Sequence, residues 1–260
     1  MDKQVEENKL RRVRRILFCG HDNRGSLYLF NGVRQAYPDV DCAVIINEGI
    51  YYRKSFLSSV WKLLRESSIL FCAVRAMEMY SYRWKGHTLE AQLEAEAIPF
   101  TKSDDINGDD AVAFAREFAP DLLVSLYTMH IYKKPILDVP KIAAINSHPA
   151  ILPDYRGLEV FFWAMANGDE RIGSSVFYLT ERVDDGLVLQ EQWVPIAADD
   201  SMHDVYDAIT ESAAELFMRA IADIDGETVK TRKPAGLGTY YPMPTRAAVR
   251  AFRRRGRRFF

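Results

Sequence analysis

The chain has 260 residues, 48% of them hydrophobic, which suits one large α/β domain with a substantial core. Its net charge of −2 excludes a polycation built as a whole for nucleic acid. Three cysteines without a spaced pattern argue against a disulfide framework, and the lack of CxxC and HExxH motifs predicts no metal site. Because the apolar runs are too short for a signal-peptide core or a transmembrane segment, we expect a cytoplasmic protein.

The first part of the chain alternates between predicted strands and helices. A strand, VRRILFCG, is followed by a polar loop, HDNRGS, a helix, LYLFNGVRQAY, and a buried strand, DCAVIIN. Residues 51–87 differ, because their apolar spacing predicts one or two inserted amphipathic helices. The embedded Arg65, Glu66, Arg75 and Glu78 favour a polar face toward solvent. We therefore prefer a helix packed on the core, or a dimer face, over a membrane-surface helix.

The alternation resumes after residue 87. HTLEAQLEAEA and GDDAVAFAREFA are predicted helices, whereas IPFTKS, PDLLVSLY and IAAIN are predicted strands. These elements predict a Rossmann-like, mostly parallel α/β sheet flanked by helices. Beyond residue 157 we expect a helix, VFFWAMANGDE, two antiparallel strands, IGSSVFYL and GLVLQEQWVPI, and a long helix. The expected organisation is a charged lead at 1–12, the α/β domain at 13–225 and a Gly-, Pro- and Arg-rich C-terminal extension at 226–260.

The stretch INSHPAILPDYRG, residues 145–157, continues the predicted strand IAAIN. Asn146 and His148 would point to the same side, at the carboxyl end of a parallel strand, where open α/β sheets bind ligands. An imidazole can move a proton near neutral pH, and an amide N–H can donate to a developing oxyanion. The pair therefore suits a reaction at a carbonyl group, although a buried structural histidine is equally compatible with the spacing.

A second stretch, ERVDDGLVLQ, places Asp184 and Asp185 in a turn before a predicted strand. Taken alone, it favours a plain Asp-Gly hairpin turn, in which Gly186 permits the tight geometry. The alternative is that one carboxylate lies beside His148, orients its ring and supports its cation.

Together, INSHPAILPDYRG, FWAMANGDERIGSSVFYL and VDDGLVLQEQWVPI resemble the folate-dependent formyltransferase family, which includes glycinamide ribonucleotide, methionyl-tRNA and sugar N-formyltransferases. The resemblance is close over about residues 120–200. It implies the formyltransferase fold, a catalytic trio of Asn146, His148 and Asp184, and 10-formyltetrahydrofolate as the formyl donor. Asp184 is chosen over Asp185 because the family pattern places a glycine two residues after the aspartate.

The resemblance also implies where donor and acceptor bind. The pterin of the donor would be held mainly by backbone groups of two segments, and GHDNRGS could cradle a phosphate or a diol, or could be a plain βα turn. Ala150 stands where the family has serine, which we expect to alter local hydrogen bonding only. The implied donor residues are Leu126, Tyr127, Thr128, Met129, His130, Ile131, Glu181, Arg182 and Val183. The implied acceptor residues are Gly20, His21, Asn23, Arg24, Ser26, Arg156 and Gly157.

The acceptor is expected to be a primary amine, preferably of a nucleotide-linked amino sugar. Too little chain follows Ile196 for the C-terminal barrel of methionyl-tRNA enzymes, and glycinamide ribonucleotide enzymes lack the 51–87 segment. The aromatic residues of TYYPMPT, 239–245, could stack on a base or sugar, although we prefer a tail that packs back on the core. The terminal arginines could bind a diphosphate or an anionic surface, although a solvated tail is preferred.

Other interpretations stay open. The acceptor could be an amino acid, glycinamide ribonucleotide or methionyl-tRNA, or the chain could be a formyltetrahydrofolate hydrolase. An RNA-binding protein that uses the Arg-rich end is a non-enzymatic alternative, which the acidic remainder of the chain weakens, and nucleic acid is not an expected partner. A non-catalytic member of the fold is the alternative we favour least, because all three trio residues are present. A homodimer is compatible with the 51–87 segment.

Overall fold

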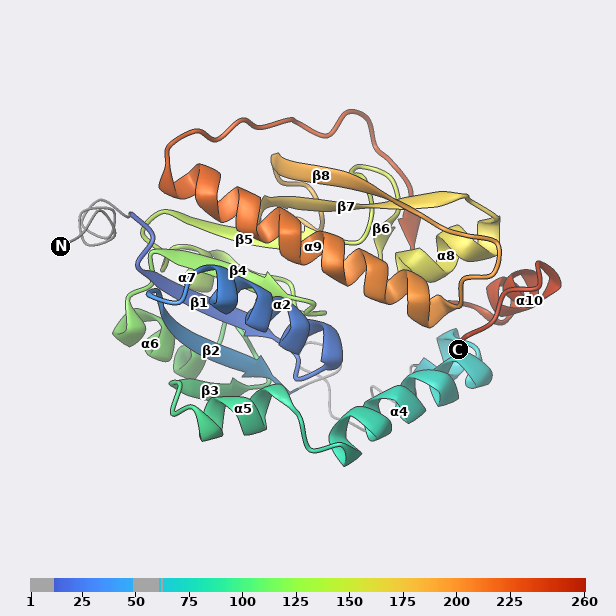
Figure 1. Cartoon of the computed structure of the whole chain (residues 1–260), viewed down its shortest axis with the longest axis horizontal. Coiled ribbons are helices and arrows are strands. Elements are labelled where there is room, and N and C mark those ends of the chain that lie inside the picture. The colour runs from blue at the N-terminus through green and yellow to red at the C-terminus, as the bar shows by residue number, and fades with distance from the viewer. Residues whose placement is uncertain (1–11, 49–60, 62) are drawn as a thin grey trace.

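The computed structural model of the chain describes residues 12–48, 61 and 63–260. Its described strands form a seven-stranded sheet in the order β3-β2-β1-β4-β5-β7-β8 and a separate pair, β6-β9 (Figure 1). Strands β1 to β5 run parallel, whereas β7 and β8 are antiparallel to their neighbours. The predicted Rossmann-like, mostly parallel sheet is thus confirmed. The strands are β1 (Arg15–Gly20), β2 (Asp41–Asn47), β3 (Phe100–Ser103), β4 (Leu122–Leu126), β5 (Ala143–His148), β6 (Arg156–Gly157), β7 (Arg171–Tyr178), β8 (Val188–Pro195) and β9 (Tyr240–Tyr241).

Helices cover both faces of the sheet (Figure 1). Successive residues of β1 point to opposite faces, so Phe18 packs with α2 and α9, and Leu17 packs with α6 and α7. The helices are α2 (Arg24–Ala36), α4 (Ile69–Trp84), α5 (Leu89–Ala95), α6 (Asp109–Phe118), α7 (Lys134–Leu137), α8 (Val160–Asn167), α9 (Met202–Asp225) and α10 (Arg246–Arg254). Among the described helices, none has both the length and the apolar character needed to cross a bilayer.

Helix α2 begins earlier than the sequence predicts. The polar loop was expected to extend through Ser26, but the helix starts at Arg24 because Asn23 caps it. Asn23 Oδ1 accepts a hydrogen bond from the Ser26 N–H at 2.9 Å, which satisfies one of the free donors of the first turn. The turn between β1 and α2 is therefore shorter than predicted.

The inserted segment is described from residue 63 onward and at Trp61, while residues 51–60 and 62 lie outside the described residues. It contains α4, in agreement with the predicted amphipathic helix. The prediction that Arg75 and Glu78 face solvent is wrong. Arg75 pairs with Glu78 and, at 3.3 Å, with Glu159, on the side of α4 that also buries Phe71. These ion pairs turn the polar side of the helix toward the protein.

Residues 226–260 pack back on the domain, so the segment is no loose tail, although most of its terminal arginines are exposed to solvent as predicted. Strand β9 pairs with β6, and α10 packs on α8, where Phe252 is fully buried and its ring stacks on Phe162 at 4.9 Å. Three of the terminal arginines donate to backbone carbonyls: Arg255 Nε lies 3.0 Å from Ala166 O, Arg257 donates to Ala198 O at 3.1 Å, and Arg258 donates to Asp199 O. The few apolar residues of this arginine-rich helix form its buried face and hold the C-terminal segment against the domain.

Candidate active site

His148 ends strand β5 and is 4% exposed. Its Nε2 lies 2.7 Å from the backbone oxygen of Tyr155, and its Nδ1 lies 3.6 Å from Asp184 Oδ1. Because a carbonyl oxygen only accepts hydrogen bonds, Nε2 carries a proton, and the Asp184 carboxylate faces Nδ1. A second proton on Nδ1 would complete an ion pair. The ring is thus fixed at both nitrogens and positioned for proton chemistry.

Asp184 reaches His148 through a tight turn after β7. Its backbone is left-handed, with φ of 50°, and its Oδ2 accepts a weak hydrogen bond from Gly157 N at 3.3 Å. A Cβ added at Gly186 would lie 1.7 Å from the backbone oxygen of Tyr178, so the turn needs glycine there. Asp185 points elsewhere and lies 3.4 Å from the exposed Arg182. Of the two aspartates, the structure therefore places Asp184 beside the imidazole.

Asn146 lies two residues before His148 on β5, on the same side of the strand. Its neighbours in the sheet are Ser125 of β4 and Phe177 of β7. The predicted trio thus gathers at the carboxyl end of β5, where a parallel strand meets the antiparallel part of the sheet. Ala150 is buried nearby, and its carbonyl accepts the Ser175 hydroxyl at 2.7 Å.

The predicted donor segment, Leu126 to Ile131, begins next to Asn146, because the preceding residue of β4 is paired with it. Several of its polar groups already form hydrogen bonds within the protein. Thr128 Oγ1 accepts hydrogen bonds from Asn47 Nδ2 at 2.6 Å and from His130 N at 3.1 Å. Tyr127 is partly buried and His130 is buried, and Met129 N donates to His21. Ile131 is the exposed apolar member of the segment.

A cavity of about 370 Å³ lies against the Asp184 turn. It brings together three predicted residues, Arg156, Arg182 and Val183, whereas Glu181 is not among its lining. Sequence reasoning missed four lining residues, and the aromatic run TYYPMPT was the one available signal for them. Nε of Arg156 is buried without a hydrogen-bond partner among the described residues. The additional lining residues are Asp185, Gly236, Leu237 and Tyr240.

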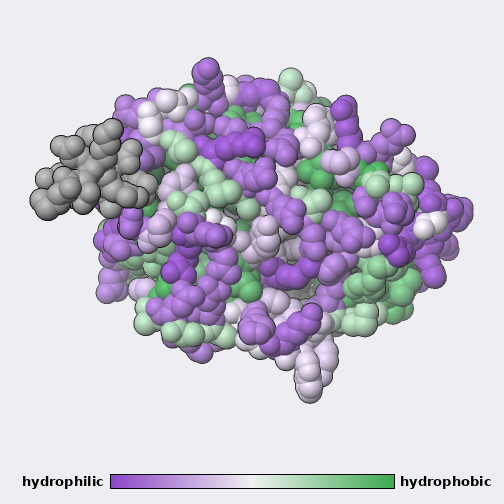
Figure 2. Space-filling model, viewed as in Figure 1, coloured by the Kyte–Doolittle hydropathy of each residue, from purple (hydrophilic) through white to green (hydrophobic). Residues whose placement is uncertain are grey.

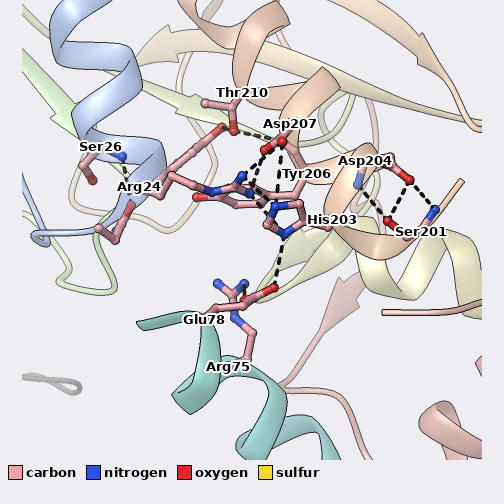
Figure 3. A network of polar contacts seen from close by, with 12 residues as sticks. Arg24, Ser26, Arg75, Glu78, Ser201, His203, Asp204, Tyr206, Asp207 and Thr210 are labelled. Carbon is pink, nitrogen blue, oxygen red and sulfur yellow. Dashed lines mark hydrogen bonds and ion pairs between the residues drawn. The ribbon is translucent and has the colours of Figure 1, made fainter. Parts of the chain in front are cut away.

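A second cavity, of about 140 Å³, lies at the start of α2. Arg24 is its one predicted residue; it pairs with Asp207 at 2.7 Å, and its guanidinium lies 5.2 Å from the ring centre of Tyr206 (Figure 3). The other lining residues, which sequence reasoning missed, are Gly25, Tyr28, Tyr206, Asp207, Thr210 and Glu211.

The remaining residues of the predicted phosphate loop serve the fold instead of either cavity. Ser26 donates its hydroxyl to Leu126 O, and Gly20 allows the close approach of β1 to β4. His21 Nδ1 lies 2.8 Å from Asn47 O, and burial lowers the pKa of His21 to about 4, against the opposing effect of that hydrogen bond. Because Asn23 acts as the helix cap, the prediction that GHDNRGS forms an open cradle is supported at Arg24 alone.

An ionic network connects the inserted helix α4 with the second cavity (Figure 3). Glu159 follows the Arg156–Gly157 strand, has a left-handed backbone with φ of 51°, and pairs with Arg75 of α4. Burial raises the pKa of Glu159, while Arg75 opposes the shift and Glu78 adds to it. His203 Nδ1 lies 3.6 Å from Glu78, and its Nε2 lies 2.8 Å from Arg24. The network therefore links α2, α4, α8 and α9 around the second cavity.

Comparisons with known proteins point to one family. The family model described as "Formyl transferase" matches residues 85–221. A methionyl-tRNA formyltransferase from Halalkalibacterium halodurans is 30% identical over 159 residues, which are 61% of this chain and 50% of that protein. The chain thus spans about half the length of the curated relatives it matches.

Two solved structures share the fold. An N-formyltransferase from Helicobacter canadensis, solved with folinic acid and dTDP-3-aminofucose, has a TM-score of 0.55 at 18% identity, covering 88% of this chain and 71% of its own. Glycinamide ribonucleotide transformylase 1 from Symbiobacterium toebii has a TM-score of 0.56 at 18% identity, covering 86% and 95%. The family match covers more than half of the described fold and the sequence motifs around the Asn146, His148 and Asp184 site. This chain therefore belongs to the formyl transferase family.

Proposed function

We propose that this chain transfers a formyl group from 10-formyltetrahydrofolate to a primary amine. The observation that carries the proposal is the position of His148 between the Tyr155 carbonyl and the Asp184 carboxylate, with Asn146 on the same side of the same strand. The resemblance to folate-dependent formyltransferases assigns the same three residues to catalysis.

Each member of the trio has a distinct task. The donor supplies an electrophilic formyl carbon. Asn146 donates an N–H to an oxygen that gains negative charge, and His148, protonated at Nδ1, adds a positive charge beside it. Asp184 holds that proton on the ring, and its carboxylate accepts, through water, the proton that the attacking amine loses as its nitrogen bonds to the formyl carbon. The bond between the formyl carbon and N10 of the donor then breaks, and N10 takes up the proton as tetrahydrofolate leaves. An oxyanion donor of this kind contributes roughly 100- to 1000-fold in rate.

The cavity beside the Asp184 turn fits the outer part of a folate. Leu237 and Tyr240 offer apolar surface to an aromatic ring, and the guanidinium groups of Arg156 and Arg182 suit the carboxylates of a glutamate tail. The pterin would then lie deeper, along the Leu126 to Ile131 segment.

The cavity at the start of α2 is our candidate for the acceptor, and a nucleotide-linked amino sugar is the proposed class. Tyr28 and Tyr206 offer ring faces for a base or sugar, and Asp207 and Glu211 can accept hydrogen bonds from hydroxyl or amino groups. The structure from Helicobacter canadensis, which contains an amino-sugar nucleotide, supports this class. Methionyl-tRNA is the second candidate, because the matching curated relatives are named methionyl-tRNA formyltransferases.

An acceptor screen tests the proposal. Purified protein with 10-formyltetrahydrofolate is offered amino-sugar nucleotides, amino acids, glycinamide ribonucleotide and methionyl-tRNA, and tetrahydrofolate release and formylated products are measured. We expect formylation of an amino-sugar nucleotide that disappears in Asp184→Asn. Formate release without any amine would replace the proposal with hydrolysis. Donor turnover that is equal in Asp184→Asn and wild type would reject the assigned site.

A further inference from the structure

Helix α4 presents an apolar face to solvent, opposite the side that packs against the rest of the domain. Phe71 and Val74 are buried and Arg75 and Glu78 are paired on the inward side. The helical period places a second set of apolar residues about half a turn away. We call these exposed residues the α4 stripe: Ile69, Leu70, Ala73, Ala76, Met77, Tyr80 and Trp84.

The α4 stripe is continuous and carries large aromatic side chains. Tyr80 is 64% exposed and Trp84 77% exposed, and their rings stack with centres 5.8 Å apart. Trp61 and Leu64, which precede the helix, are also exposed. Contiguous apolar surface of this kind marks an interaction site on a folded domain, because water solvates it poorly.

Positive charge lies next to the α4 stripe. Ser67 Oγ and Ser68 N both donate to the carbonyl of Pro244, which joins the start of α4 to the start of α10. Residues 63–87 and 245–260 contain eleven basic and two acidic residues, in a chain whose net charge is −2. Figure 2 shows the hydrophobic patch over the first part of α4 beside the hydrophilic surface of α10. The exposed arginines of α10 are Arg246, Arg250, Arg253 and Arg254.

We propose that the α4 stripe and the arginines of α10 bind an anionic lipid bilayer surface. Tryptophan and tyrosine are favoured at the membrane interface, and an apolar helix face with flanking arginines binds anionic headgroups by hydrophobic and electrostatic terms together. A second copy of the chain fits less well. A 16-residue helix offers an area of roughly 250 Å², whereas a stable dimer buries about 800 Å² on each partner, and two such surfaces would oppose like charges. The inference does not depend on the proposed function.

Vesicle flotation tests the proposal. The full chain is mixed with vesicles of phosphatidylcholine alone or of phosphatidylcholine with phosphatidylglycerol, at low and high salt. We expect flotation with the anionic vesicles, loss of it at high salt, and a blue shift of tryptophan emission on binding. The double variant Tyr80→Ala, Trp84→Ala should lower partitioning about tenfold, because it removes the aromatic anchors. Arg250→Ala with Arg253→Ala should lower it to a similar extent, on anionic vesicles only.

Matched controls separate the surface from general effects. Trp193 is half exposed on β8, and Arg116 is exposed on α6, so Trp193→Ala and Arg116→Ala should partition as wild type does. Thermal melting confirms that each variant is folded. Absence of flotation by the wild type on both kinds of vesicle would overturn the proposal. So would light scattering that shows a dimer disrupted by the Tyr80 and Trp84 substitutions, without binding to vesicles.

Discussion

Oδ1 of Asp184 lies 3.6 Å from Nδ1 of His148. His148 ends β5, and Asp184 lies in the turn between β7 and β8, so the two side chains meet only in the folded sheet. The opposite nitrogen of the ring is held by the backbone of Tyr155. A carboxylate beside one nitrogen and a carbonyl on the other fix the orientation of the buried ring.

Replacing Asp184 by asparagine should abolish most formyl transfer. The amide keeps the shape of the side chain but removes the negative charge that faces His148, so we expect a loss of roughly 100-fold or more in kcat/KM. Asp185→Asn is the comparison variant, because its carboxylate pairs with Arg182 in the proposed donor cavity and does not face His148; we expect it to raise KM for the donor with little change in kcat. Steady-state kinetics of both variants provide the measurement. Equal losses of kcat in the two variants would show that activity depends on the turn as a whole and not on the charge of Asp184.

Replacing Phe252 by alanine should show that the C-terminal segment belongs to the core. The ring is fully buried against Phe162 and Phe259, so its removal should lower the free energy of unfolding by about 3–5 kcal/mol. Phe260→Ala, at a half-exposed ring, should cost about 1 kcal/mol or less. Urea unfolding measures the free energy of unfolding of both variants. A change of less than about 1 kcal/mol for Phe252→Ala would mean that the segment is only loosely attached.

The stability of the protein should fall in mild acid because of His21. Burial lowers its pKa from 6.5 to about 4, so between these values the unfolded state binds more protons than the folded state. Stability is therefore full above pH 6.5 and is lost as the pH falls toward 4, by up to about 3 kcal/mol from this group. His21→Gln should lose less stability across that window in urea unfolding. Parallel pH curves for the two proteins would contradict the prediction.

Glu159 should give a pH dependence of the opposite sign. Burial raises its pKa above the ordinary 4.5, so the folded state holds a proton that the unfolded state has released. Its contribution to stability is greatest below pH 4.5 and declines as the pH rises through the folded pKa. The stability of wild type minus that of Glu159→Gln should therefore decrease with rising pH, as measured by urea unfolding. If this difference instead increased with pH, the ion pair with Arg75 would outweigh the effect of burial on the pKa of Glu159.

Much of the fold and the site could be predicted because local patterns dominate there. The strands around Leu17 and Val124 are continuous apolar runs, and the motif glycine Gly186 has a steric reason to follow Asp184. The position of Asp184 beside His148 follows from family resemblance, since the sequence alone favoured a plain hairpin turn.

The errors arose where tertiary contacts overrode local composition. Arg75 and Glu78 look like solvent-facing residues, yet each finds a partner inside the protein that is distant in the chain. Helix α10 is rich in arginine, and its few apolar residues reveal a buried face only when α8 is placed against them. The lining residues Leu237 and Tyr240 reach the Asp184 turn because β9 pairs with β6, a contact between segments that no local pattern links.

The pairing of β6 with β9 also sets an order of events during protein synthesis. Tyr155 and Gly157 hold His148 and Asp184 through their backbone, and Tyr155 N in turn donates to Thr239 Oγ1 at 2.8 Å. A ribosome makes the catalytic motif long before it makes the strand that braces it. A nascent chain that already contains all three proposed catalytic residues would therefore lack the support of β9 behind Tyr155 until Tyr241 has emerged and paired with Gly157.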